Sequence, residues 1–112
     1  MPKDELQLGE FEQYVLLAVL SLKKGAYGAS IRQQLHEAIS RDVSLGALYA
    51  TIERLEKRGL VSSNLDGATA KRGGKAKRMI EVTAIGKKAL QRSRQQLTTM
   101  WGLAQLRGIT YV

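Results

Sequence analysis

Cysteine is absent from this chain of 112 residues, and histidine occurs once. Without cysteine there are no disulfides, and no thiolates for catalysis or for the usual zinc and iron–sulfur sites. With His36 as the single imidazole, a metal site would need carboxylates for almost all of its ligands. We therefore expect neither a metal nor another cofactor.

Long apolar runs and catalytic clusters are also missing. The longest apolar run, residues 15–20, is too short to cross a bilayer, and the charged start predicts no signal peptide, so a cytoplasmic protein without a membrane partner is expected. Acidic pairs such as Glu53 and Glu56 come without a matching base, nucleophile or glycine-rich phosphate loop. The sequence therefore indicates no enzyme.

Basic charge is what the chain has in excess, and it lies in one part of the sequence. Residues 1–70 carry 8 Lys and Arg against 9 Asp and Glu, a net charge of −1, whereas residues 71–112 carry 10 against 1, a net charge of +9. A cationic C-terminal part suits a polyanion, with nucleic acid first and an anionic membrane surface second. A basic surface that serves solubility alone is the remaining alternative.

The first expected helix covers residues 9–22 and is apolar on nearly every side. Such a helix is buried all round. Because the chain is only one domain long, one flank is expected to face the core and the other a second subunit. The expected subunit contacts on this helix are Phe11, Leu16 and Leu20.

Two further helices follow in close succession. Residues 27–40 show one apolar stripe, and after a short link Ser44 supplies an N-cap for a helix that runs to about residue 58 and ends at Gly59. Two helices joined so tightly predict a helix-turn-helix.

After Gly59 the pattern changes to strand-like runs at residues 60–65 and 79–82, which flank a glycine-containing loop. From Thr83 a last helix is expected to about residue 101, with apolar residues at sevenfold spacing that indicate a dimer contact. The fold class is therefore mainly α with a small β-hairpin: a winged helix-turn-helix over residues 1–83, then a C-terminal dimerisation helix and tail over residues 84–112. The expected dimer contacts on the last helix are Leu90, Leu97, Met100 and Trp101.

The third helix carries a candidate DNA-reading face. On a helical wheel the core side is formed by Leu45, Leu48, Ile52 and Leu55. The opposite side is small at its start and cationic at its end, which lets a helix come close to base edges before a cation reaches a guanine or a phosphate. A merely solvated face is an equal alternative. The candidate residues are Ser44, Gly46, Ala47, Tyr49, Ala50, Thr51, Arg54 and Lys57.

The hairpin loop adds a second candidate contact with double-stranded DNA. Five cations stand within eight residues, with no acidic residue between them. On a loop softened by glycines, such a run suits phosphate contact, although charge runs are often just solvated. The residues are Lys71, Arg72, Lys75, Lys77 and Arg78.

Several blocks of the chain resemble the PadR family of transcriptional regulators, over roughly residues 8–103. The most specific are residues 43–56, VSLGALYATIERLE, and residues 72–78, RGGKAKR; the others are residues 16–20, 26–31, 59–61 and 82–83 with Gly86. The chain departs from the family at Met79, Ile80 and Glu81, where aromatic and cationic residues are usual. No DNA contact is therefore assigned to that strand.

The resemblance implies a homodimeric repressor on a near-palindromic operator, with Tyr49 near DNA, the wing on the backbone and one C-terminal helix making the dimer. In some relatives an aromatic residue on this helix helps to bind a planar ligand between the subunits. Trp101 is accordingly expected to pack the dimer, with contact to a small-molecule effector as the less favoured role. A winged-helix module that binds protein and a dimer that sequesters ligands are the competing functions.

Overall fold

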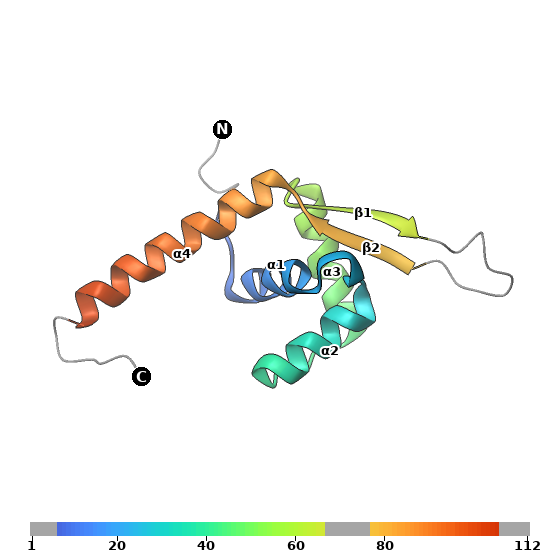
Figure 1. Ribbon diagram of the computed structural model, residues 1–112, viewed down its shortest axis with the longest axis horizontal. Helices are drawn as coiled ribbons and strands as arrows, with labels where there is room; N and C mark the ends of the chain where they lie inside the picture. The colour runs from blue at the N-terminus through green and yellow to red at the C-terminus, as the bar shows by residue number, and fades with distance from the viewer. Residues whose placement is uncertain (1–6, 67–76, 106–112) are drawn as a thin grey trace, which may run out of the picture.

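The computed structural model describes residues 7–66 and 77–105. The elements in chain order are α1 (Glu10–Leu22), the 3-10 turn η2 (Lys23–Gly25), α2 (Gly28–Ile39), α3 (Leu45–Lys57), β1 (Val61–Asp66), β2 (Lys77–Val82) and α4 (Ala84–Gln105) (Figure 1). The predicted order of three helices, a hairpin and a last helix is confirmed, and α4 continues past the expected end at about residue 101.

Local signals in the sequence set the helix ends. The Ser44 hydroxyl accepts a hydrogen bond from the Ala47 amide at 3.1 Å, as the predicted N-cap of α3. Gly59, just after α3, has φ of 76°, a conformation that favours glycine. The Thr83 hydroxyl accepts from the Gly86 amide at 3.0 Å and so caps α4.

The core is built around α1, which packs against α2, α3, β2 and α4. Figure 1 shows this helix in the middle of the molecule, with α2 and the hairpin on different sides of it. Val15 and Leu16 are fully buried there. The expectation that Leu16 contacts a second subunit is therefore wrong, because its side chain is enclosed by its own protomer. Leu45, expected on the core side of α3, is 39% exposed at the first turn of that helix.

The two strands form an antiparallel hairpin in which Val61 pairs with Val82 and Asp66 with Lys77. The hairpin is attached to the helices through its backbone. The Ile80 amide donates to the Ala26 carbonyl at 2.9 Å, just before α2, while the Ile80 side chain is buried in the core. This bond fixes the position of β2 beside the start of α2.

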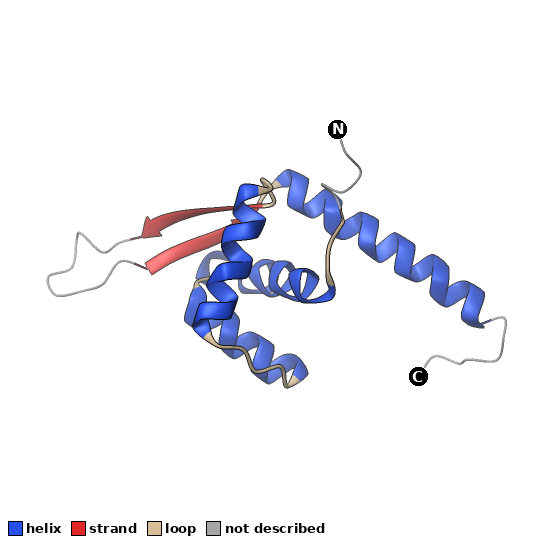
Figure 2. Ribbon diagram, turned by 180° about the vertical axis from the view of Figure 1, so that it is seen from behind, coloured by secondary structure: helices blue, strands red, loops and turns tan. Residues whose placement is uncertain are grey.

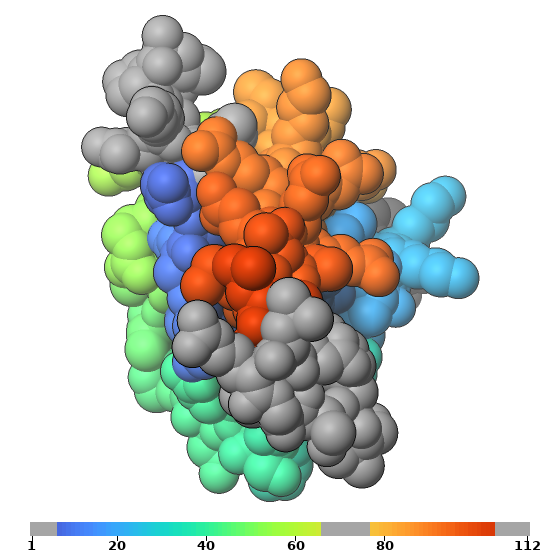
Figure 3. Space-filling view, turned by 90° about the vertical axis from the view of Figure 1, so that its left-hand side faces the viewer, coloured from blue at the N-terminus to red at the C-terminus, as the bar shows by residue number. Residues whose placement is uncertain are grey.

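Helix α4 has a buried beginning and an exposed remainder. Ala89 and Leu90 belong to the core, so Leu90, expected at the dimer contact, instead packs inside its own protomer. Beyond these residues α4 projects away from the other elements (Figures 1 and 2). In the space-filling view from the α4 side, the orange and red surface of this helix faces the viewer (Figure 3).

Close packing at the start of α4 predicts a strong effect of one added methyl group. A Cβ at Gly86 would lie 2.2 Å from the Leu60 carbonyl oxygen and 2.7 Å from Val82 Cγ1. Gly86→Ala should therefore lower the free energy of unfolding by about 1–3 kcal/mol through overpacking. Denaturant titration followed by circular dichroism measures this.

Gly46→Ala is the matched control, because a Cβ at Gly46 meets no atom within 4 Å. It should leave stability unchanged or raise it, by up to about 1 kcal/mol, through the lower unfolded-state entropy of alanine. Equal stability losses for the two variants would contradict the packing described at Gly86.

Candidate nucleic-acid interface

The outward side of α3 has the exposure predicted from the helical wheel. Leu48, Ile52 and Leu55 are buried on one side. The exposed residues on the other side are Gly46, Ala47, Ala50, Arg54 and Lys57. The backbone of the first two turns is therefore covered only by small side chains, and the two cations stand further along the helix.

A groove of about 510 Å³ runs beside this side of α3, between the helix, the turn before it and the start of α1. Its lining includes Ala47, Ala50 and Arg54 of α3 together with Phe11 of α1. Phe11 was expected at a subunit contact. The structure places it at this groove, where it is half-buried.

Arg41, which sequence analysis did not single out, forms the wall of this groove opposite α3. Its guanidinium lies 5.3 Å from the ring centre of Phe11, 5.7 Å from that of Tyr14 and 3.5 Å from Glu10 Oε1. These contacts hold a cation in the turn of the helix-turn-helix. Only its place in the short link between two helices could have indicated it.

Thr51 does not have the exposure expected of a DNA contact. Its side chain is only 3% exposed, and its hydroxyl donates to the Ala47 carbonyl at 3.2 Å. The same hydroxyl accepts a hydrogen bond from Arg54 Nη2 at 3.1 Å. Thr51 is thus a positioning residue for Arg54, and the expectation that it reaches DNA itself is corrected.

Tyr49 is half-buried and lies on the flank of α3 that faces the start of α2. A Cβ at Gly28 would stand 2.2 Å from the Tyr49 hydroxyl oxygen and 2.6 Å from Cζ. The absent side chain of Gly28 therefore makes the space for the phenol ring. This agrees with the interpretation of Gly28 as a packing residue.

Two of the five wing cations lie within the described residues, and both contact the body of the protein. Lys77 Nζ stands 4.4 Å from the centre of the Tyr27 ring. Arg78 donates from Nε to the Ser63 hydroxyl and from Nη2 to Glu56 Oε1, each at 3.0 Å. Lys71, Arg72 and Lys75 lie outside the described residues.

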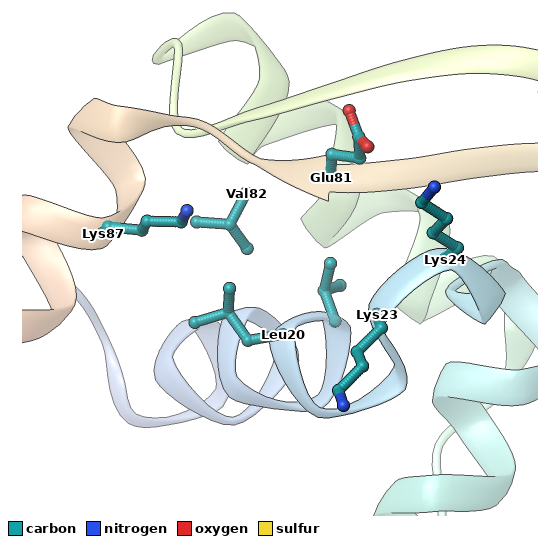
Figure 4. A pocket seen from close by; sticks show the side chains of 7 residues that line it. Leu20, Lys23, Lys24, Glu81, Val82 and Lys87 are labelled. Carbon is teal, nitrogen blue, oxygen red and sulfur yellow. The ribbon is translucent and has the colours of Figure 1, made fainter.

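The remaining candidate subunit contacts are exposed. Leu97 is 56% exposed and Met100 is 61% exposed, and Trp101 and Leu20 are exposed to a lesser degree. Leu20 also lines a pocket of about 370 Å³ between α1, β2 and α4, together with Val82, Glu81 and three lysines (Figure 4). Trp101 does not line this pocket.

No helix among the described residues is long and apolar enough to span a bilayer. Within those residues no three His, Asp or Glu side chains gather as ligands for a metal ion. His36 is exposed, and its Nδ1 lies 2.6 Å from Asp42 Oδ1.

The fold defines a winged helix-turn-helix protein. Helices α2, α3 and α4 pack around α1, α3 has one exposed side, and the hairpin lies beside it. The model of the transcriptional regulator PadR-like family matches residues 16–92, and the chain belongs to this family. The family is one of transcriptional regulators, not of enzymes.

Solved structures share this fold. A PadR family transcription regulator from hypervirulent Clostridium difficile is 23% identical, with a TM-score of 0.69 over 88% of this chain and 99% of that one. A PadR-like regulator from Bacillus cereus is 21% identical, with a TM-score of 0.67 over 88% and 93%. The Aeropyrum pernix ORC1 protein in complex with DNA is 22% identical, with a TM-score of 0.62 over 80% and 25%. No curated protein matches the chain in sequence.

The cap of α3 can be tested apart from any DNA contact. Ser44→Ala removes the acceptor of the Ala47 amide and should lower the free energy of unfolding by about 1 kcal/mol. Ser44→Asp should keep stability near that of the unchanged protein, because aspartate is an equally good N-cap and its charge favours the helix start. Thermal unfolding without DNA checks both, and equal losses in the two variants would contradict the capping role.

Proposed function

We propose that the protein is a sequence-specific DNA-binding repressor that acts in the cytoplasm as a homodimer on a near-palindromic operator. The observation that carries this proposal is the exposed side of α3, small at its start and cationic at its end. Membership of a family of transcriptional regulators supports it, as does the shared fold of the ORC1 protein solved with DNA.

The proposed reading mechanism uses the shape of α3. Gly46, Ala47 and Ala50 allow the helix backbone to approach base edges in the major groove, which is wide enough for an α-helix. Arg54, held by the Thr51 hydroxyl, then presents a guanidinium with little freedom left to lose. A fixed guanidinium suits bidentate contact with O6 and N7 of a guanine.

The proposed grip on the phosphates comes from the wing. Lys71, Arg72 and Lys75 would add contacts that hold the duplex without distinguishing its sequence. The turn residue Arg41 lines the other side of the α3 groove, but it is paired with Glu10, so no phosphate contact is assigned to it. Tyr49 and Lys57 complete the α3 contacts in this proposal.

The proposed dimer is formed by the exposed part of α4. Leu97, Met100 and Leu103 are apolar residues that leave more than half of their side-chain surface exposed within one protomer. A second copy of α4 would cover them, and the two-fold symmetry of the pair would match a near-palindromic site. Release of DNA by a planar molecule near Trp101 stays a prediction.

Selection from a pool of randomised duplexes tests the proposal directly. A repressor of this kind should enrich an inverted repeat, whose affinity at physiological salt exceeds that of a scrambled duplex by at least about 10³-fold. A protein-binding module would enrich no sequence and would bind all duplexes weakly. Such an outcome would overturn the proposed function.

Loss of a base contact and loss of phosphate contacts should affect DNA binding in different ways. Arg54→Ala should cost about 1–3 kcal/mol on the selected duplex and little on a scrambled one. Replacing Lys71, Arg72 and Lys75 together by alanine should weaken both duplexes and flatten the dependence of log affinity on log salt by about 0.9 per lost phosphate contact. Titrations at several salt concentrations measure both effects. The reverse pattern would mean that the two roles are exchanged.

The dimer is tested at Leu97. Leu97→Glu places a charge on the exposed apolar seam of α4, so it should shift the protein toward monomer and weaken binding to the selected duplex. Gln91→Glu, which adds one negative charge at an exposed position of the same helix, is the control for added negative charge. Sedimentation at micromolar concentration is the measurement. A monomeric unchanged protein would contradict the dimer.

A further inference from the structure

The first two residues of β2 hold the wing from opposite sides. Successive side chains of a strand point to opposite faces, so Lys77 and Arg78 diverge. Lys77 lies over the Tyr27 ring just before α2, and Arg78 reaches Glu56 of α3. The N-cap residue of α2 and a residue of α3 therefore both contact the base of the wing.

The contact with α3 is a closed network of three side chains from three elements. Besides its two bonds from Arg78, the network contains a bond from the Ser63 hydroxyl to Glu56 Oε2 at 2.9 Å. Ser63 is the diagonal neighbour of Arg78 across the hairpin, because Arg78 pairs with Leu65. Each carboxylate oxygen of Glu56 thus accepts one hydrogen bond, and the side chain is only one-third exposed.

We propose that Glu56 is a positioning residue: an internal counter-ion that keeps Arg78 on α3 and away from DNA phosphates, and so sets the sequence-independent part of the affinity for duplex DNA. This inference rests on the proposed DNA-binding function. A free arginine at the base of the wing would bind the backbone of any sequence equally well. By occupying it, Glu56 lowers non-specific affinity and fixes the wing relative to the reading helix.

Binding to random duplex depends almost entirely on the number of phosphates neutralised. An arginine that is already paired with a carboxylate adds little to that number. The network therefore lowers the affinity for the selected and the random duplex alike, whereas Arg54 acts mainly on the complex with the selected duplex.

The test compares Glu56→Gln with Glu53→Gln. Both changes remove one negative charge from α3, but Glu53 is exposed and its change leaves the Glu56 to Arg78 bridge in place. Glu56→Gln should raise affinity for a scrambled duplex and steepen its salt dependence by about 0.9 per protomer, as one phosphate contact is gained. Glu53→Gln should raise affinity less and leave the slope unchanged. Equal slopes for the two variants would overturn the proposal.

Arg78→Gln provides the second measurement. In the otherwise unchanged protein it should leave the salt slope on scrambled duplex as it was, because Arg78 makes no phosphate contact while Glu56 holds it. In the Glu56→Gln background it should return the steepened slope to the original value. A slope flattened by about 0.9 per protomer in the single variant would show Arg78 on phosphate and would also overturn the proposal.

The network can be measured without DNA, which separates its failure from failure of the proposed function. In thermal unfolding, the midpoint losses of Glu56→Gln and Arg78→Gln should not add in the double variant, because either change breaks the same bridge. Additive losses would mean that the bridge is not formed in solution. Non-additive losses with no preference for any selected duplex would leave the bridge standing and overturn the DNA-binding function.

Discussion

The arrangement depends on the burial of α1. Val15 and Leu16 are fully enclosed, and the helix contacts α2, α3, β2 and α4. Because one helix supports α3, the hairpin and the first turns of α4, their relative positions are set by the packing around it. Interiors packed to the density of organic crystals resist gradual deformation. The core therefore determines the geometry of the exposed side of α3 as well as stability.

A second set of contacts ties the wing to the helix-turn-helix at three points. The backbone bond from Ile80 to Ala26 fixes one strand, the Lys77 ammonium lies over Tyr27, and the Arg78 guanidinium joins α3 through Glu56. The backbone bond is independent of pH and salt, whereas the two charged contacts are partly exposed and weaken as salt rises. The base of the wing is thus held by contacts of different physical character.

Local features were predictable from the sequence, and contacts between distant elements were not. The Ser44 cap and the φ of Gly59 follow from residue type and neighbours within a few positions. The enclosure of Leu16 was not predictable, because a helix apolar on every side does not show which flank meets its own core.

The candidate site divides in the same way. The exposed side of α3 followed from helical periodicity, and the burial of Thr51 agrees with the same periodicity, because Thr51 stands three positions after Leu48 and four before Leu55. Glu56 and Arg78 are 22 positions apart, and only the hairpin register brings them together.

The length of α4 has a consequence for the spacing of a dimer: its 22 residues form one uninterrupted helix of about 33 Å, with one end packed in the core. If two such helices paired along their exposed parts, the distance between the two α3 helices would depend on where the α4 helices cross. In such a dimer, inserting half a helical turn of DNA between the half-sites would place one half-site on the far side of the duplex. Two α3 helices held apart by rigid α4 helices could not then reach both half-sites.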